Sequence, residues 1–411
     1  MVSDVTYERG KIMKVKVTCC GVAALVFVTL LLSGTVGYAK EARGVTNDTI
    51  KYGIVCDMTG PVARQSQEHM RGFKNCLLNA NDQGGIHGRN FKITIEDDHY
   101  SIPASVAAFK KLVYKDKVMA VWGSIGTQAA NALFPRIAKE KIPYSIASVS
   151  DIVTKPYKRY VFGSASSYED NIKVIYDYIM KDLNAKDPKI SLVCSDNEHG
   201  KVGQRAAEKS AQHYNIKPPG IEILAPMVLD ATSQVLSLKR TRPDYIIIHG
   251  IVPNTAALLR DARKFGLRSN FFGTYFSCSE EMVRMAKKAA ENFTGAHCLS
   301  SWDDKGPGIA GMREIALKYQ PKKTWRSRDY IQGWVTGLTH VEAIKRAGKN
   351  LDAESFVDAL ETIKDFSTKG LSGPITYDSK SHKPLDSCKL FKADVENGSL
   401  IPVTDWRKPS F

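Results

Sequence analysis

Three short segments rich in small polar residues are the first candidates for chemistry. They are residues 57–61, 123–127 and 147–150, and each follows a short apolar run. Ser and Thr hydroxyls and the backbone N–H groups of Gly can hold a carboxylate, especially where a helix begins, as expected after Thr127. A plain turn between a strand and a helix uses the same residue types. With three such segments at one sheet edge, a ligand site and plain turns both stay open.

Two common catalytic motifs and the usual spacing of zinc ligands are absent from the sequence. Neither the nucleophile elbow G-x-S-x-G nor the phosphate loop G-x-x-x-x-G-K-[ST] occurs. The nine histidines lie at least 12 residues apart, so no pair has the spacing of zinc ligands on one helix. We therefore expect no catalytic residue, no metal and no cofactor.

The elements that must position these segments alternate in type, which predicts a parallel sheet flanked by helices. Two successive modules of this kind argue for two lobes. Strands are predicted at 49–56, 91–96, 118–123 and 143–147, then at 190–195, 220–224, 245–249 and 271–274. Helices are predicted near 65–82, 104–116, 128–139, 169–182, 200–214, 232–240, 255–265 and 280–290.

Beyond Gly295 the alternation stops. Helical segments are predicted near 307–319, 327–347 and 353–364, before β-like runs at 375–377, 388–392 and 400–402. A tail of this size is too small for a third domain with a large core, so we expect it to complete the two lobes.

Composition and charge place the chain among globular proteins. Of its 411 residues, 43% are apolar and 25% charged, and 58 basic against 43 acidic side chains give a net charge of +15. No run of five or six like charges forms a basic arm, so nucleic acid is not an expected partner.

The first 39 residues have the pattern of a secretory signal peptide. Basic residues between Arg9 and Lys16 precede an apolar stretch at 19–32, and small residues follow. That stretch is shorter than the roughly 20 residues that span a bilayer, so cleavage after Ala39 is favoured over an uncleaved anchor. The mature protein is expected to be exported to the periplasm.

Six cysteines follow the predicted cleavage site, and they allow 15 pairings among which sequence alone does not choose. Cys56 ends a predicted strand and Cys76 lies about three turns into the next helix, which argues against their pairing. Cys298 and Cys388 lie in short β-like runs and form the pair we favour. The remaining two are Cys194 and Cys278.

Several motifs, weak singly but specific in combination, resemble the leucine/isoleucine/valine-binding protein family, whose members are substrate-binding proteins of ABC importers. The resemblance covers nearly the whole mature chain. The motifs are GVT at 44–46, IKYG at 50–53, TGP at 59–61, NDQGGIHGR at 81–89, DD at 97–98, GSIGTQ at 123–128, PDY at 243–245 and LRDARKFGL at 259–267.

The resemblance implies an α/β fold of the type I periplasmic binding protein class, with two Rossmann-like lobes joined by three hinge crossings. Lobe 1 would comprise residues 40–162 and 300–373, and lobe 2 residues 163–299 and 374–411. A small ligand would bind between the lobes, drive hinge closure and be delivered to permease subunits in the membrane.

The resemblance also implies the ligand-binding residues, position by position. Lobe 1 would supply Met58, Thr59, Gln65, Ser124, Ile125, Gly126, Thr127, Ala147, Ser148 and Val149. Lobe 2 would supply Tyr168, His199, His249, Ile251, Tyr275 and Phe276.

At three of these positions the chain departs from the amino-acid-binding members. Gly126 aligns with a serine that holds the α-carboxylate, Val149 with a threonine, and Tyr275 with a glutamate that faces the α-ammonium. Because a buried ammonium without an acidic partner is costly, we infer that the ligand is not a simple zwitterionic amino acid. The aromatic residues and histidines suit an aromatic or other apolar carboxylate, or a neutral amide-like molecule.

Other functions remain open at this point. A ligand sensor of the same fold would pass occupancy to a receptor instead of a transporter, and an amino-acid or amide binder is a further alternative. A hydrolase using Ser124 or Ser148 would turn its bound compound over, whereas a binding protein returns it unchanged.

Overall fold

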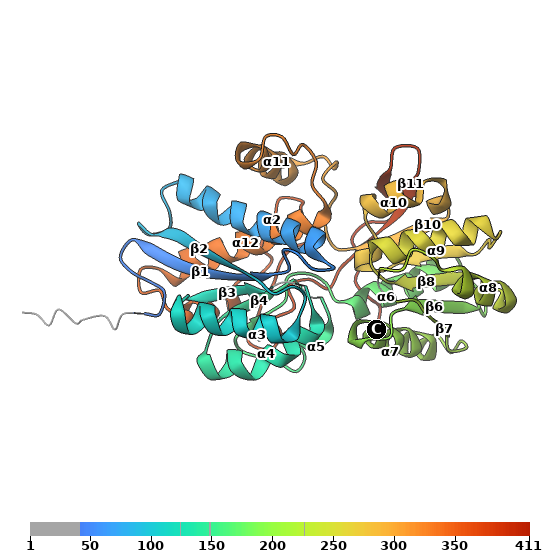
Figure 1. Cartoon of the computed structure of the whole chain (residues 1–411), viewed down its shortest axis with the longest axis horizontal. Coiled ribbons are helices and arrows are strands. Elements are labelled where there is room, and N and C mark those ends of the chain that lie inside the picture. Colours follow the sequence, from blue (N-terminus) through green and yellow to red (C-terminus); the bar gives the residue numbers. More distant parts are fainter. Residues whose placement is uncertain (1–41, 124, 148, 226) are drawn as a thin grey trace, which may run out of the picture. The chain divides into compact units, whose positions relative to one another are not determined.

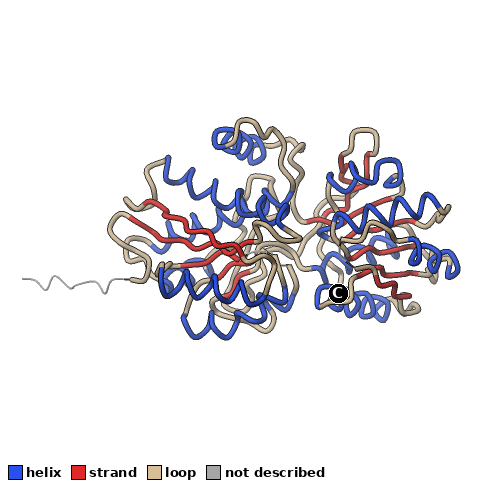
Figure 2. The backbone as a smooth tube through the Cα atoms, viewed as in Figure 1, coloured by secondary structure: helices blue, strands red, loops and turns tan. Residues whose placement is uncertain are grey.

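The computed structural model describes residues 42–411 except Ser124, Ser148 and Pro226. The predicted signal peptide and its cleavage site lie outside the described residues. Two β-sheets, each flanked by helices, make up this part of the chain (Figures 1 and 2). The type I periplasmic binding protein fold expected from the sequence is confirmed by the structural neighbours described below.

The first sheet has five parallel strands in the order β2-β1-β3-β4-β5. Its strands are β1 (Thr49–Cys56), β2 (Asn90–Asp97), β3 (Ala120–Gly123), β4 (Tyr144–Ile146) and β5 (Val161–Phe162). The segments between them form α2 (Ala63–Asp82), α3 (Ile102–Lys110) with a π-helical extension (Lys111–Lys115), α4 (Thr127–Glu140) and α5 (Asp151–Thr154).

The second sheet has seven strands in the order β12-β11-β10-β9-β8-β6-β7. The parallel strands are β6 (Ile190–Cys194), β7 (Gly220–Ile223), β8 (Tyr245–His249), β9 (Asn270–Gly273) and β10 (Phe293–His297). The antiparallel strands β11 (Lys389–Asp394) and β12 (Ser399–Pro402) extend its edge. The helices are α6 (Tyr168–Asp177), continued by a π-helical turn (Tyr178–Asp182), α7 (Glu198–His213), α8 (Thr232–Thr241), α9 (Val252–Lys264) and α10 (Glu280–Ala286).

The late helices return the chain to the first sheet. They are α11 (Pro307–Tyr319), α12 (Arg328–Ala347) and α13 (Ala353–Glu361), and α12 lies side by side with α2 (Figure 1). Two glycines allow this close approach. A Cβ atom at Gly72 would clash with the Tyr330 carbonyl oxygen, and one at Gly333 with the His69 carbonyl oxygen.

Two expectations about secondary structure were wrong, and three short elements, α5, β5 and β10, were not predicted. Residues 375–377 form no strand, because Ile375 pairs only in an isolated bridge with Phe366. Helix α4 begins at Thr127 with Gly126 as its N-cap, so Thr127 is not the cap.

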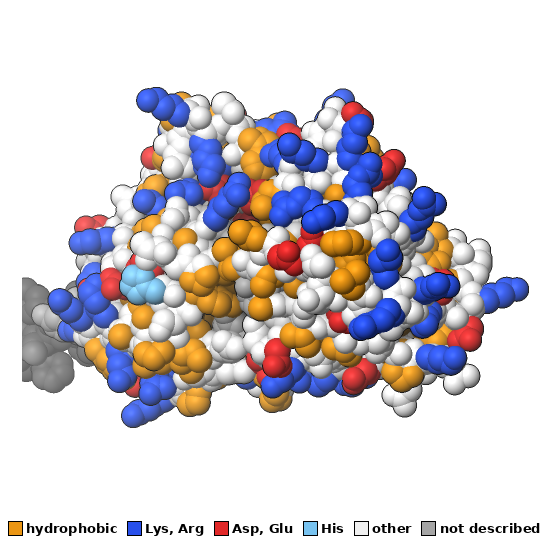
Figure 3. Space-filling view, turned by 45° about the vertical axis from the view of Figure 1, so that its right-hand side comes forward, with side chains coloured by type: hydrophobic (Ala, Val, Ile, Leu, Met, Phe, Trp, Pro, Cys, Tyr) orange, Lys and Arg blue, Asp and Glu red, His pale blue; other side chains and the backbone are white. Residues whose placement is uncertain are grey.

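The described surface and interior add three observations. Lys and Arg side chains are spread across the face in Figure 3, in keeping with a basic surface that lacks a single basic run. Among residues 42–411, the described helices include none that is long and apolar enough to cross a membrane. All six described cysteines are buried thiols, so no disulfide joins Cys298 and Cys388 in this structure. The lobe boundaries stay a prediction.

The glycine contact between α2 and α12 generates a prediction about stability. We expect Gly333→Ala to lower the free energy of unfolding by about 1–3 kcal/mol, because the added methyl group forces two packed helices apart. Gly311→Ala in α11 is the control, since its new Cβ would meet no atom within 4 Å. That change should raise stability by about 0.5–1 kcal/mol through helix propensity. Chemical denaturation measures both, and equal effects would contradict the packing argument.

Candidate functional site

A predominantly apolar cavity lies where strands of both sheets end. It encloses about 760 Å³ of empty space, its open mouth included. Its lining comes from the loops and helix starts that follow β1, β2, β3, β6, β7, β8 and β9, and from the start of α6. The lining residues are Pro61, Val62, Tyr100, Ile125, Gly126, Thr127, Gln128, Tyr168, Ser195, Asn197, His199, Met227, Gly250, Ile251, Asn254 and Phe276.

Five helices begin at this cavity. The residues at their starts line it: Val62 caps α2, Gly126 caps α4, Tyr168 opens α6, Asn197 caps α7 and Ile251 caps α9. The first turn of a helix has N–H groups without intrahelical partners and carries the positive end of the helix dipole. The cavity is therefore surrounded by positive peptide dipoles that favour an anionic group.

The described lining contains no Asp, Glu, Lys or Arg. His199 is neutral near pH 7, because burial and the neighbouring His249 hold its pKa well below the usual range. The remaining polar side chains are hydroxyls and amides, which hydrogen-bond without carrying charge. The described lining thus offers helix N-termini, hydroxyls and amides to a ligand, but no carboxylate to an ammonium group.

The aromatic wall on the second-sheet side is held by ring contacts. The His199 and His249 rings stack with centroids 3.9 Å apart, and Tyr168 meets both edge-on at 4.8 and 5.0 Å. His249 lies behind this wall, where its Nδ1 is 2.8 Å from Thr274 Oγ1 and its Nε2 is 3.0 Å from the His199 carbonyl oxygen. His249 therefore positions His199, the residue that faces the cavity.

The start of α4 shapes the opposite side. Gly126 has a φ of +138°, a conformation that side chains rarely adopt, and it directly precedes the first turn of α4. Tyr100 lies close by, with its Cε2 3.5 Å from where a Cβ of Gly126 would stand. The glycine thus leaves the α4 N-terminus beside an aromatic ring with no side chain between them.

The structure brings together seven of the residues implied by the family resemblance. Ser124 and Ser148 lie outside the described residues. Those that line the cavity are Ile125, Gly126, Thr127, Tyr168, His199, Ile251 and Phe276. Those placed elsewhere are Met58, Thr59, Gln65, Ala147, Val149, His249 and Tyr275.

Two of the residues placed elsewhere have clear structural surroundings. Thr59 Oγ1 donates to Asp97 Oδ2 over 2.9 Å and lies 2.7 Å from His99 Nδ1. Tyr275 is buried, stacks on His297 at a centroid distance of 4.1 Å and meets Phe276 edge-on at 5.1 Å. Its ring therefore supports Phe276 from behind the cavity wall.

Pro61, from the candidate segment 57–61, also lines the cavity, and sequence reasoning missed the eight other lining residues. Four of them follow β6 and β8, so the strand-end rule applied to the first sheet would have found them in the second. These four are Ser195, Asn197, Gly250 and Asn254, and the other four are Val62, Tyr100, Gln128 and Met227.

Neither a dinucleotide-binding turn nor a metal site is found among the described residues. The glycine pattern G-x-G-x-x-G at 306–311 opens α11, but a loop and not a strand precedes it, so it lacks the context of a dinucleotide-binding turn. In the part of the chain that the structure describes, no group of three or more His, Cys, Asp or Glu side chains could hold a metal ion.

Comparisons with known proteins agree with this architecture. A family model described as periplasmic binding protein matches residues 49–399. The Leu/Ile/Val-binding protein of Escherichia coli is 23% identical over 356 residues, which cover 85% of this chain and 92% of the relative. These matches confirm the resemblance drawn from the motifs.

Solved structures show the same fold. A branched-chain amino acid ABC transporter protein from Thermus thermophilus with bound valine has a TM-score of 0.83 at 22% identity, covering 89% of this chain and 98% of that one. A fatty acid ABC transporter substrate-binding protein from Thermomonospora curvata has a TM-score of 0.80 at 21% identity, covering 90% and 95%.

The buried histidines generate a prediction about pH. Burial lowers the pKa of His249 and of His69 to about 4. Between about pH 6.5 and pH 4 the unfolded chain binds protons that the folded chain does not. The free energy of unfolding that the two neutral histidines contribute is therefore full above pH 6.5 and is lost as the pH falls to 4. Each histidine contributes on the order of 3 kcal/mol. We expect Tm to fall steeply over this range.

His249→Gln should flatten that dependence, because Gln can retain hydrogen bonds and takes up no proton. His213→Gln, at an exposed position, is the control and should leave the profile unchanged. Thermal unfolding at pH 7, 5.5 and 4.5 measures the effect, and a Tm independent of pH in the parent protein would contradict it.

Proposed function

The chain belongs to the periplasmic binding protein family, and from that premise we propose that it is the extracytoplasmic substrate-binding protein of an ABC importer. It captures a small organic ligand between two lobes, closes about its hinge and delivers the ligand to permease subunits. The names of its relatives support this role, since they include binding proteins for leucine, isoleucine and valine. It performs no catalysis.

The ligand is an aromatic or other apolar carboxylate. One observation carries this proposal: five helix N-termini meet at a cavity whose described lining has no charged side chain. A carboxylate gains from those N–H groups, with each helix end worth about 0.3–1 kcal/mol, whereas an ammonium group would be repelled by the same dipoles and find no acidic partner. The rings of Tyr100, Tyr168 and Phe276 suit the apolar part of the ligand.

Two further points support the proposal. One structural neighbour is named as a fatty acid transporter protein, so an apolar acid is compatible with this fold. We also propose that residues 1–39 act as a cleaved signal peptide that sends the mature protein to the periplasm, in keeping with the family's description as periplasmic binding protein.

A thermal-shift comparison of matched compounds tests the ligand class. Benzoate and hexanoate are set against benzamide and hexanamide, which share their shape without the charge, and against leucine and valine. A ligand at 100 times its Kd adds about 2.7 kcal/mol of stability, an increase visible as a higher Tm. We expect shifts with the acids, weaker shifts with the amides and none with the amino acids. A shift with leucine or valine alone would make the protein an amino-acid binder.

Asn254→Asp tests the electrostatic argument directly. Asn254 Oδ1 accepts a hydrogen bond from the Ile251 N–H over 2.9 Å, and an aspartate can keep that bond while adding a negative charge to the cavity. We expect the Kd for the carboxylate to rise at least about tenfold, equivalent to about 1.4 kcal/mol. Calorimetric titration measures the change.

Ser279→Asp is the matched control. Ser279 Oγ caps α10 by accepting from the Met282 N–H over 3.1 Å, and Ser279 is not part of the described lining. It adds the same charge at a cap outside the cavity, so binding should stay as in the parent. Unchanged affinity in Asn254→Asp would mean that the carboxylate does not lie near α9.

A further inference from the structure

Cys298 directly follows β10 and Cys388 directly precedes β11, and these two strands pair antiparallel. Their register sets Ala296 against Leu390 and His297 against Lys389. Continued by one residue beyond the paired strands, the same register would set Cys298 against Cys388. Neighbours across an antiparallel pair point to the same face of the sheet, so the two thiol side chains leave the backbone on one side.

The backbone hydrogen bonds define the type of this pair. Cys388 exchanges two hydrogen bonds with Arg407, its N–H donating to the Arg407 oxygen and its oxygen accepting from the Arg407 N–H, each over 2.9 Å. Its backbone groups therefore point away from Cys298, which makes the cysteines a non-hydrogen-bonded pair. Such pairs have Cα atoms about 4.5 Å apart, within the 4.4–6.8 Å range over which disulfides form.

The sulfur atoms converge on one neighbour. The Ser166 N–H donates to Cys298 Sγ over 3.5 Å, and Ser166 Oγ lies 3.2 Å from Cys388 Sγ. Both cysteines are fully buried. Each sulfur thus lies beside the same residue, Ser166.

We propose that Cys298 and Cys388 form a disulfide when the chain folds in an oxidising compartment. A thiolate of one attacks a small disulfide such as oxidised glutathione and releases one thiolate. The second cysteine then attacks the mixed disulfide, forming the Cys298–Cys388 bond and releasing another. The two cysteine protons go to the two released thiolates, so atoms and electrons balance.

The disulfide would join the two ends of the segment that leaves the second sheet, packs on the first and returns. Residues 299–387 contain α11, α12 and α13, and the cysteines stand at the two ends of this segment. A backbone bridge between Leu299 and Ser372 lies next to one of them. The disulfide therefore ties together the outgoing and returning segments, and the long loop that it closes is where such a bond constrains the unfolded chain most.

The timing of oxidation follows from burial. Burial raises the pKa of the Cys298 thiol to about 11 and holds that of Cys388 well above its usual range. Few thiolates form at pH 7 in the folded protein, so bond formation belongs to folding, before the thiols are covered.

The experiment maps disulfides in the full chain under two conditions. In one, the chain is harvested from the periplasm of a bacterial host after free thiols are blocked with iodoacetamide. In the other, cytosolic chain is unfolded and refolded with reduced and oxidised glutathione. Proteolysis and mass spectrometry should recover a peptide pair joined through Cys298 and Cys388 in both. Only the first condition depends on the proposed export, so failure to recover the chain from the periplasm, together with a bridge after refolding, would refute export and keep this inference. Periplasmic chain without the bridge would overturn the inference.

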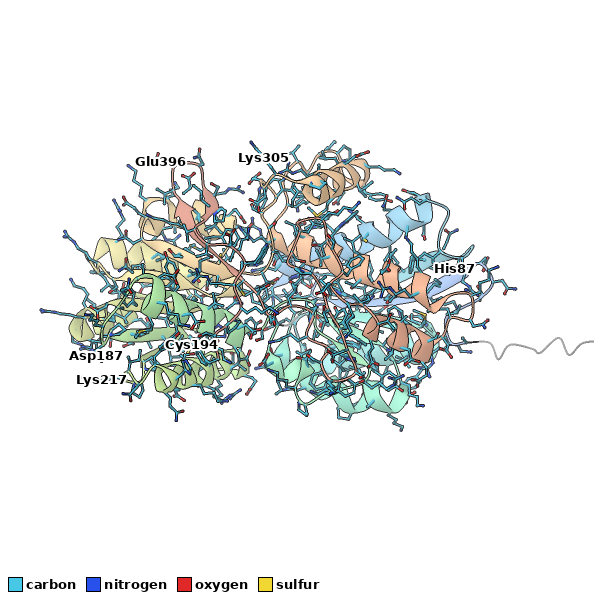
Figure 4. All side chains as sticks on the ribbon, turned by 180° about the vertical axis from the view of Figure 1, so that it is seen from behind. His87, Asp187, Cys194, Lys217, Lys305 and Glu396 are labelled. Atoms are coloured by element: carbon cyan, nitrogen blue, oxygen red, sulfur yellow. The ribbon has the colours of Figure 1, made fainter. Side chains whose placement is uncertain are left out.

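Variants separate the bridge from simple loss of a buried sulfur. Cys298→Ser should remove the linked peptides and lower the Tm of oxidised protein by roughly 5 °C. Cys194→Ser is the control, because Cys194 on β6 (Figure 4) is also a buried thiol but is flanked by Ile223 and His249. It should keep the linked peptides. Alkylated Cys298 and Cys388 after refolding, or either one joined to another cysteine, would overturn the proposal.

Discussion

The direction of the parallel strands is the constraint on which the rest of this molecule depends. After β1, β3, β6 and β8 the chain leaves the strand at its carboxyl end and turns into a helix, so the positive ends of α2, α4, α7 and α9 meet at one cavity. Backbone dipoles at these helix ends can favour an anionic group without a charged side chain in the described lining. The fold and the proposed ligand preference therefore follow from the same strand polarity.

Helix α12 joins the two sheets at its first turn. Arg328 Nε donates to Glu280 Oε1 on α10 over 3.0 Å, and its Nη1 donates to the Leu299 carbonyl oxygen over 2.6 Å. Both side chains of this ion pair are buried. Removing one partner would leave a buried charge unpaired and lower the free energy of unfolding by about 3–5 kcal/mol. Further along, Gly333 packs against α2, and α12 thus links the second sheet to the helix layer of the first.

The sequence predicted elements best where local pattern and tertiary position agree. The predicted bounds of β1, β8 and α11 match the structure, because flanking residues mark their ends, such as Gly306 and Pro307 at the start of α11. Strand β10 was missed since its Phe-Thr-Gly-Ala-His run is weakly apolar. Its Gly295 is needed for packing, as a Cβ there would lie 2.5 Å from Cys278 Sγ. The same limit applies to the site: Tyr275 aligned with a ligand-facing position, but which of two neighbouring rings faces a cavity depends on packing, and Phe276 does.

The proposed selection between ligands depends on the absence of charged side chains from the described lining as well as on the helix N-termini that meet there. A zwitterionic amino acid and an apolar acid can place the same carboxylate at the same helix ends, so that contact does not distinguish them. The ammonium does, because burying it without an acidic partner costs several kcal/mol. His199, whose pKa is held well below its usual range by burial and by the neighbouring His249, offers at most a hydrogen bond in compensation. The proposed discrimination therefore rests on the uncharged wall, and any change that adds an acidic side chain to that wall should move the preference toward amino acids.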